Sequence, residues 1–201
     1  MQQVSDEWFR LRAGKITGTC FSVLMSKKVG GVSRPAMIRR LAEERITGVR
    51  EAGFRSEAMI RGEEMEPEAR RWYEFHTGND VTQSAFITHP ALPFVGVSPD
   101  GLVGEDGGVQ IKCPLDEGHK KFVRLSRLPS QYRWQVQGEL WVSGREWWDF
   151  VSYPDDGDGV ILRVTPDHEM HRQLEAECIK ANEEIEKIVK LLADKEALTD
   201  G

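Results

Sequence analysis

Apolar residues recur at helical spacing over the first fifty positions of the chain. Residues 5–26 predict two short helices that meet around Gly14, or one helix that is broken there. Residues 27–33 predict a loop. Pro35 then suits the first turn of a helix that Gly48 ends, because the N–H that proline lacks has no helical partner in that turn.

A further helical region spans residues 56–76. We expect it to be interrupted near Gly62 and to restart near Glu66 and Pro67, because glycine and proline both weaken a helix interior. Gly78 is expected to end it, since glycine adopts the left-handed conformation of a C-cap.

Beyond Gly78 the pattern changes to short segments typical of strands, separated by glycine-rich turns. The predicted strands are residues 81–88, 92–97, 101–103, 109–112, 147–153 and 160–164. A helix is predicted at about residues 129–142, and a long amphipathic helix from about residue 167. This order predicts an α/β protein in which helices flank a mixed central sheet.

Composition narrows the class of protein. The chain has 201 residues, of which 39% are hydrophobic and 30% charged, so we expect one globular domain over residues 1–201. No apolar run approaches the roughly 18 residues of a membrane span, and the first residues lack a secretory pattern. Cys20, Cys113 and Cys178 lie too far apart for a disulfide framework, a zinc site or an iron–sulfur cluster. A cytoplasmic protein that does not contact membranes is expected.

The net charge of −6 argues against indiscriminate binding to a polyanion. It leaves room for a local basic groove, because phosphate contacts depend on local charge. Basic residues cluster in two stretches of the chain. A basic groove and ordinary solvated helix faces explain these clusters equally well. Their members are Lys27, Lys28, Arg34, Arg39, Arg40 and Arg45 in the first, and Lys120, Lys121, Arg124, Arg127 and Arg133 in the second.

The segment with the clearest chemistry begins at Asp100, which follows one predicted strand and precedes Gln110, Ile111 and Lys112 on the next. Side chains alternate along a strand, so Gln110 and Lys112 point to one face and Ile111 to the core. A tight hairpin would bring Asp100 beside that pair. Carboxylates suit Mg²⁺ and a nearby lysine can orient water, which is the layout of metal-assisted phosphodiester hydrolysis.

This spacing alone is common, because Asp-Gly turns and lysines at strand ends occur in many proteins. The upstream Glu66 strengthens the pattern as a further acid that could face a metal. Glu66 also has a purely structural explanation, since the helix dipole favours acids near helix starts.

Five stretches, in this order, resemble the phage-type exonucleases, namely lambda exonuclease and the YqaJ-like recombination nucleases of the PD-(D/E)xK superfamily. They are Trp8-x3-Arg12-x-Gly14-x-Ile16-Thr17, Arg61-Gly62-x3-Glu66, Ser98-Pro99-Asp100-Gly101, Ile111-Lys112-Cys113-Pro114 and Gln135-Val136-Gln137-x3-Trp141-Val142. The resemblance implies a restriction-endonuclease-like core. It also implies digestion of linear duplex DNA from the 5′ end, which releases mononucleotides and leaves 3′ overhangs.

The resemblance also assigns roles to residues. Asp100 and Glu66 would bind two Mg²⁺ ions, which Mn²⁺ can replace, together with position 110 and the backbone carbonyl of Ile111. Lys112 would orient the attacking water. A pocket for the 5′-phosphate would use Arg12, Thr19, Ser98 and Gln135. The resemblance further implies a homotrimer, a single-strand annealing protein as partner in recombination, and a phage or prophage origin in a bacterial host.

Position 110 departs from the family, which has glutamate where this chain has Gln110. An amide lacks the charge of a carboxylate and binds a hard cation more weakly. Two explanations compete: an engineered, substrate-trapping variant, or a natural member that lacks this acid. We favour the first, because the other expected residues, Glu66, Asp100 and Lys112, are all present. The enzyme is therefore expected to be impaired.

Two other functions stay open at this point. A non-catalytic protein that binds DNA ends on the same fold would carry Gln110 as its natural residue. A restriction-type endonuclease would nick a closed DNA circle, whereas an exonuclease would spare it.

Overall fold

The computed structural model describes residues 5–25, 33–50, 56–84, 86–155 and 157–199. Its helices are α1 (Asp6–Arg12), α2 (Gly18–Met25), α3 (Arg34–Thr47), α4 (Glu57–Thr77), α5 (Asp116–Leu125), α6 (Ser130–Ser143) and α7 (His168–Thr199). Its strands are β1 (Ile16–Thr17), β2 (Val81–Thr82), β3 (Ile87–Thr88), β4 (Val95–Val97), β5 (Gly101–Val103), β6 (Gly107–Lys112), β7 (Trp147–Ser152) and β8 (Val160–Val164).

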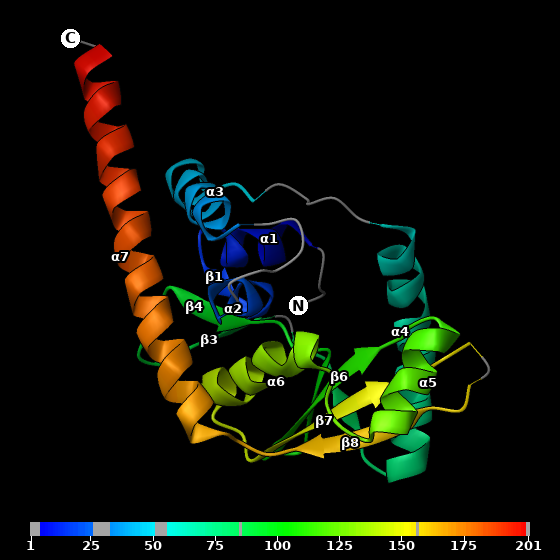
Figure 1. The fold of residues 1–201 in the computed structure, drawn as a ribbon. Coiled ribbons are helices and arrows are strands. Elements are labelled where there is room, and N and C mark those ends of the chain that lie inside the picture. The colour runs from blue at the N-terminus through cyan, green and yellow to red at the C-terminus, as the bar shows by residue number, and fades with distance from the viewer. Residues whose placement is uncertain (1–4, 26–32, 51–55, 85, 156, 200–201) are drawn as a thin grey trace.

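A five-stranded sheet in the order β2-β5-β6-β7-β8 forms the centre of the fold (Figure 1). β6 runs parallel to β7, and the other neighbours are antiparallel. On one face Tyr73 of α4 packs against Val109 and Ile111. On the other face α5 and α6 cover β7, where Phe122 and Phe150 belong to one buried cluster. The prediction of a mixed sheet flanked by helices is confirmed.

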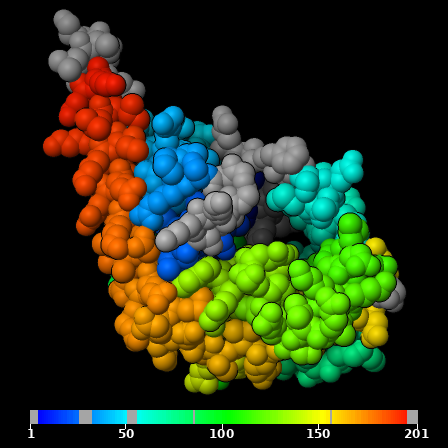
Figure 2. Space-filling view, viewed as in Figure 1, coloured from blue at the N-terminus to red at the C-terminus, as the bar shows by residue number. Residues whose placement is uncertain are grey.

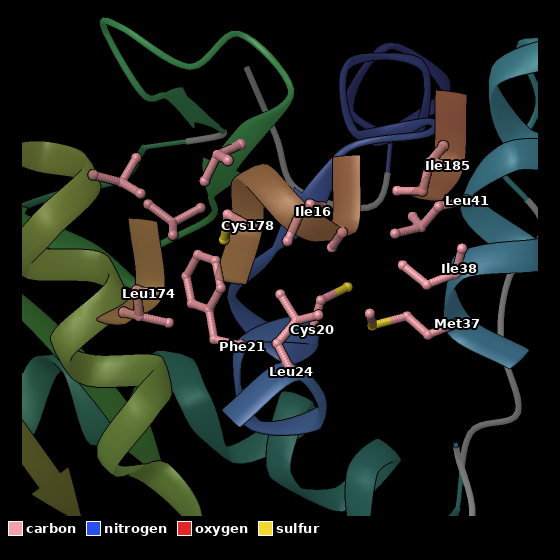
Figure 3. Close-up of a cluster of buried hydrophobic side chains, with 14 of the residues drawn as sticks. Ile16, Cys20, Phe21, Leu24, Met37, Ile38, Leu41, Leu174, Cys178 and Ile185 are labelled. Atoms are coloured by element: carbon pink, nitrogen blue, oxygen red, sulfur yellow. The ribbon is translucent and has the colours of Figure 1, made fainter. Parts of the chain in front are cut away.

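A second core lies beside this sheet. β4 lies between β1, which is parallel to it, and β3, which is antiparallel. The side chains of α2, α3 and α7 meet around Phe21, Leu41 and Cys178, all fully buried (Figure 3). In Figure 1, α7 runs along one side of the molecule and α4 lies on the other. None of the described helices is long and apolar enough to cross a membrane.

Local sequence explains where several helices begin and end. The hydroxyls of Ser5, Ser33 and Ser56 each accept an N–H from the first turn of the following helix, at 3.2–3.3 Å. Gly48 and Gly78 end α3 and α4 with φ values of 67° and 70°, a conformation that favours glycine. Both predicted C-caps are confirmed.

The prediction for residues 5–26 was incomplete, because a short strand, β1, separates the two helices. Ile16 pairs with Val95, almost eighty positions away, and a local pattern carries no signal for such a pairing. The predicted loop over residues 27–33 lies almost entirely outside the described residues.

The predicted break near Gly62 was wrong, since α4 is continuous and contains Pro67. Ala69 and Tyr73, further along α4, are fully buried against the sheet, and this packing outweighs the local cost of glycine and proline. The single strand predicted over residues 81–88 was also wrong. It is two short strands, β2 and β3, that belong to different sheets. The sequence prediction also missed α5.

Candidate active site

Asp100 lies at the turn that leads into β5. The antiparallel pairing of β5 with β6 sets Gly101 opposite Val109, so Asp100 lies beside Gln110. Oδ2 of Asp100 accepts a hydrogen bond from the side-chain nitrogen of Gln110 and a second from the backbone N–H of Ile111, at 2.7 Å. The hairpin thus brings these residues together as the strand alternation predicted.

Glu66, Asp100 and Lys112 line one cleft of about 490 Å³. Glu66 comes from α4, Asp100 from the β4–β5 turn and Lys112 from the end of β6. Arg70, one helical turn after Glu66, donates a hydrogen bond to its Oε1. Nζ of Lys112 lies 5.6 Å from the ring centre of Tyr132, which lines the same cleft. Helix α4 and the hairpin of β5 and β6 therefore direct Glu66, Asp100 and Lys112 into one space.

The electrostatics of this cleft disfavour two isolated negative charges. Burial and the nearby Asp100 carboxylate together raise the pKa of Glu66 to about 7, although Arg70 and Lys112 oppose the shift. Burial also raises the pKa of Asp100, although Lys112 and the N–H of Ile111 lower it. A bound cation would remove this repulsion, so the cleft has the electrostatic character of a cation site.

A chain of amides connects Asp100 to a second buried acid. Nε2 of Gln135 donates to Oε1 of Gln110 at 2.7 Å and to Oε1 of Glu139 at 3.0 Å. Glu139 is 1% exposed, and its Oε2 has no hydrogen-bond partner among the described residues. Burial, with the charge of Asp100, raises the pKa of Glu139 well above its usual range. A proton on this carboxyl avoids an uncompensated buried charge.

The residues predicted to bind the 5′-phosphate are partly gathered around Ser98. The Ser98 hydroxyl accepts hydrogen bonds from Nη1 of Arg12 at 2.6 Å and from Nε1 of Trp8 at 3.0 Å. The Arg12 guanidinium stacks on the Trp8 ring, 4.1 Å from its centre. Burial, with a contribution from the nearby Arg50, lowers the pKa of Arg12 to about 10. Arg12 therefore stays charged at neutral pH.

Arg12 has the features of an anion-binding group. Only 8% of it is exposed, and its Nε finds no hydrogen-bond partner within the described part of the chain. The group to which its Nη1 donates, the Ser98 hydroxyl, is neutral and does not compensate the charge of Arg12. A buried cation with an unused donor favours an anionic ligand such as a phosphate group.

The other two residues predicted to bind the phosphate, Thr19 and Gln135, have no hydrogen bond to Arg12 or Ser98 among the described residues. Thr19 is exposed on the first turn of α2. Gln135 lies next to Gly18 of the same turn, where an added Cβ would be 3.6 Å from its Cγ. Its amide nitrogen already donates to Gln110 and Glu139, so a phosphate would have to compete with these partners. The phosphate-binding roles of Thr19 and Gln135 stay predictions.

The donor set of the cleft fits Mg²⁺ or Mn²⁺. In the described residues no three His, Cys, Asp or Glu side chains gather as a metal cluster. Of the acids that line the cleft, Glu63, Glu66 and Asp100, the pair Glu66 and Asp100 are the expected ligands. Mg²⁺ is commonly held by one or two carboxylates with waters and substrate phosphates as the remaining ligands. The neutral amide of Gln110 is directed at Asp100 rather than presenting its oxygen to the cleft.

Comparison with known proteins identifies the family. Residues 7–146 match the model of the YqaJ-like viral recombinase domain. The chain belongs to this family. All the candidate site residues lie inside the matched segment, whereas α7 lies outside it. The resemblance predicted from the sequence motifs is therefore confirmed, and among curated proteins none matches the chain.

Solved structures extend the match over the whole fold. An alkaline exonuclease, LHK-Exo, from Laribacter hongkongensis is 35% identical with a TM-score of 0.89, over 97% of this chain and 100% of that one. Its complex with dAMP matches over the same shares, with 35% identity and a TM-score of 0.88. A phage-related exonuclease from Haemophilus somnus 129PT shares the fold at 13% identity, with a TM-score of 0.66 over 89% and 96% of the two chains.

Three residues of the site were missed by the sequence prediction, and one signal would have found them. Trp8 lies four positions before Arg12, Arg70 four after Glu66, and Glu139 four after Gln135. Positions four apart are neighbours on a helix surface. Extending each predicted helical site residue by one turn in both directions would therefore have reached its partner.

Proposed function

We propose that this chain is a divalent-metal-dependent nuclease that binds the ends of linear duplex DNA and digests one strand from its 5′ end. It releases 5′ mononucleotides, leaves 3′ overhangs for recombination, and is slowed by Gln110. The convergence of Glu66, Asp100 and Lys112 in one cleft carries this proposal. Membership of the YqaJ-like family and the 35% identity to an alkaline exonuclease support it.

The roles follow from the chemistry of each group. Asp100 and Glu66 hold the cations, with the carbonyl of Ile111 and position 110 as the further ligands of a two-ion site. When bound, Mg²⁺ or Mn²⁺ supplies positive charge to the phosphodiester and lowers the pKa of a water. Lys112 orients the attacking water, since its amine enters the cleft beside both acids.

The terminal phosphate occupies the pocket around Arg12 and Ser98, with Thr19 and Gln135 at its edge. The buried guanidinium, with an unused N–H, supports this assignment. Holding the end of the strand at a fixed distance from the cleft explains removal of one nucleotide at a time, because position rather than sequence then selects the scissile bond.

The wider setting is proposed from the family alone. The chain acts in the cytoplasm of a bacterial host on behalf of a phage or prophage, as a homotrimer, with a single-strand annealing protein as its partner. A ring of three copies would concentrate one basic surface around the duplex.

The decisive experiment compares this chain with its Gln110→Glu variant on linear duplex labelled at the 5′ or the 3′ end, with and without a 5′-phosphate, in Mg²⁺ and in Mn²⁺. We expect the variant to release 5′ label as mononucleotides about 10²–10³-fold faster, the effect of one charged contact in the transition state. Equal rates would exclude position 110 as a ligand. Earlier loss of 3′ label would reverse the polarity, and nicking of a closed circle would indicate an endonuclease.

A non-catalytic protein that binds DNA ends is the second candidate. The hydrogen bond from Gln110 to Asp100 favours it, because the amide satisfies the carboxylate that a metal would need. Tight binding of duplex ends without hydrolysis in either metal, unchanged in the Gln110→Glu variant, would establish this function instead.

A further inference from the structure

A second and larger cavity adjoins the cleft. It has a volume of about 1290 Å³ and lies between α5, the start of α6, β7, β8 and the residues that lead into α7. Lys112, Pro114 and Tyr132 line both spaces, so the cavity and the cleft meet at the candidate catalytic lysine. In Figure 2, α5, α6 and the first turns of α7 form the lower front surface of the molecule.

The lining of this cavity is strongly cationic, although the chain as a whole carries a charge of −6. Its basic residues are Lys112, Lys121, Arg127, Arg133 and Arg163, and the carboxylate among its described lining residues is Asp167. Such a local surplus of positive charge in an acidic protein favours an anionic ligand, because cations gathered in a recess focus the electrostatic potential.

Besides Lys112, which also lines the cleft, two of these cations are available to a ligand. Arg163 is held by the buried carboxylate of Asp149 through two hydrogen bonds of 2.9 Å, and Arg133 lies 3.8 Å from Asp167. Lys121 and Arg127 are exposed, and neither is paired with a carboxylate in the described parts of the chain. The free charge therefore lies on α5 and on the turn that follows it.

The size and aromatic content of the cavity point to a strand rather than a small molecule. Small-molecule sites usually enclose roughly 300–1,000 Å³, and this space is larger. Tyr132 stands half-buried where the cavity meets the cleft. Cations that follow a phosphate backbone, combined with an aromatic ring for base stacking, are typical of sites for single-stranded nucleic acid.

We propose that this cavity binds the uncut DNA strand as a single-stranded 3′ overhang, next to the cleft in which the other strand is cut. The inference rests on the proposed function and adds a substrate subsite to it. When nucleotides leave one strand, the remaining strand is the continuous single-stranded polyanion beside Lys112. Lys121 and Arg127 contact its phosphates, and Tyr132 stacks on a base at the entrance.

Binding of fluorescent DNA ends to the full chain tests this proposal, measured by anisotropy in Ca²⁺ with intact DNA verified on a gel. One duplex is blunt, one carries a 3′ single-stranded tail, and one carries a 5′ tail. The test variant combines Lys121→Ala with Arg127→Ala. The matched control combines Lys120→Ala with Arg124→Ala, because these exposed cations lie on the same helix as Lys121 but do not line the cavity.

The test variant should bind the 3′-tailed duplex about tenfold more weakly, and the slope of log K against log salt should fall by about 1.4, or about 0.7 for each lost contact to a single strand. Its affinity for the blunt and 5′-tailed duplexes should stay within about twofold of the parent. The control variant should treat all three duplexes alike.

Three results would overturn the inference while leaving the proposed function intact: an equal loss on all three duplexes, no loss on any, or a loss confined to the 5′ tail. If the unmodified chain binds no DNA end at all, the proposed function fails and this subsite fails with it.

Discussion

The side-chain nitrogen of Gln110 donates a hydrogen bond to Oδ2 of Asp100, the same oxygen that accepts the N–H of Ile111. An ionised glutamate at position 110 cannot donate this bond and would set a second carboxylate against Asp100. The amide of Gln110 therefore avoids the repulsion that a glutamate would add, a repulsion that a bound cation would relieve. Stability and metal affinity should consequently change in opposite directions at this position.

We predict that Gln110→Glu lowers the stability of the metal-free chain by about 1–2 kcal/mol and enlarges the stabilisation by Mg²⁺. Melting curves in EDTA and in Mg²⁺ measure both effects, with about 2–4 °C expected per kcal/mol for a chain of this length. Gln173→Glu, on an exposed position of α7, adds the same charge far from the cleft and serves as control. Equal Mg²⁺ shifts in the two variants would show that position 110 does not face the metal.

Metal binding should depend on pH through Glu66, whose pKa is raised to about 7 by burial and by Asp100. Below that pH the cation must displace a proton, so affinity rises from pH 6 to pH 8. At pH 7 loading of the site therefore releases about half a proton from Glu66. Titration calorimetry in buffers of different ionisation enthalpy counts this proton. A Glu66→Gln variant should bind more weakly and without the pH dependence, and proton release that persists in it would assign the titration to another group.

The buried Glu139 predicts a second, separate pH effect, on folding. Its pKa is higher in the folded chain than in the unfolded one, so the folded state keeps the proton after the unfolded state has lost it. Stability then falls as the pH rises above about 4.5. Glu139→Gln keeps the oxygen that accepts from Gln135 and removes the ionisation. Urea unfolding should show little difference at pH 4.5 and a more stable variant at pH 8. Glu175→Gln, at an exposed position of α7, is the control and should be as stable as the parent at both pH values.

Arg12 should set the preference for a 5′-phosphate. Lysine at this position keeps the charge but loses the planar donors that hold Ser98 and stack on Trp8. We expect Arg12→Lys to weaken binding of 5′-phosphorylated ends about tenfold, with little change for 5′-hydroxyl ends. Arg10→Lys, exposed on the same helix, is the matched control. An equal loss on both kinds of end would assign Arg12 to folding rather than to the phosphate.

The sequence predicted the elements whose signals are local. Helical spacing of apolar residues, a proline in a first turn, a terminal glycine and strand alternation gave α3, β5, β6, α6, β8 and α7 nearly at their observed positions. The hairpin that brings Asp100 to Gln110 followed from the same alternation. What failed depends on distant partners: β1 exists because Ile16 meets Val95, and β2 and β3 separate because they join different sheets.

The candidate site divides in the same way. Motif spacing located Glu66, Asp100 and Lys112, because each lies in a stretch with a recognisable pattern. The contact of Gln135 with Gln110 could not be predicted, since it depends on how α6 packs over β6. The basic residues of α5 were visible as a cluster. The place of Lys121 on the cavity wall required the fold, because α5 itself was not predicted.

Two glycines inside helices, Gly62 in α4 and Gly138 in α6, should respond to alanine in opposite ways. Open space surrounds the position of a Cβ at Gly62, whereas a Cβ at Gly138 would lie 2.2 Å from the Phe21 ring. Gly62→Ala should therefore stabilise the chain by about 0.5–1 kcal/mol, because alanine favours a continuous helix. Gly138→Ala should destabilise it by about 1–3 kcal/mol, since the contact between α6 and α2 must open. Urea unfolding of the two variants in parallel measures both effects. Destabilisation by Gly62→Ala would mean that α4 is broken there after all, and stabilisation by Gly138→Ala would mean that α2 does not pack closely on α6.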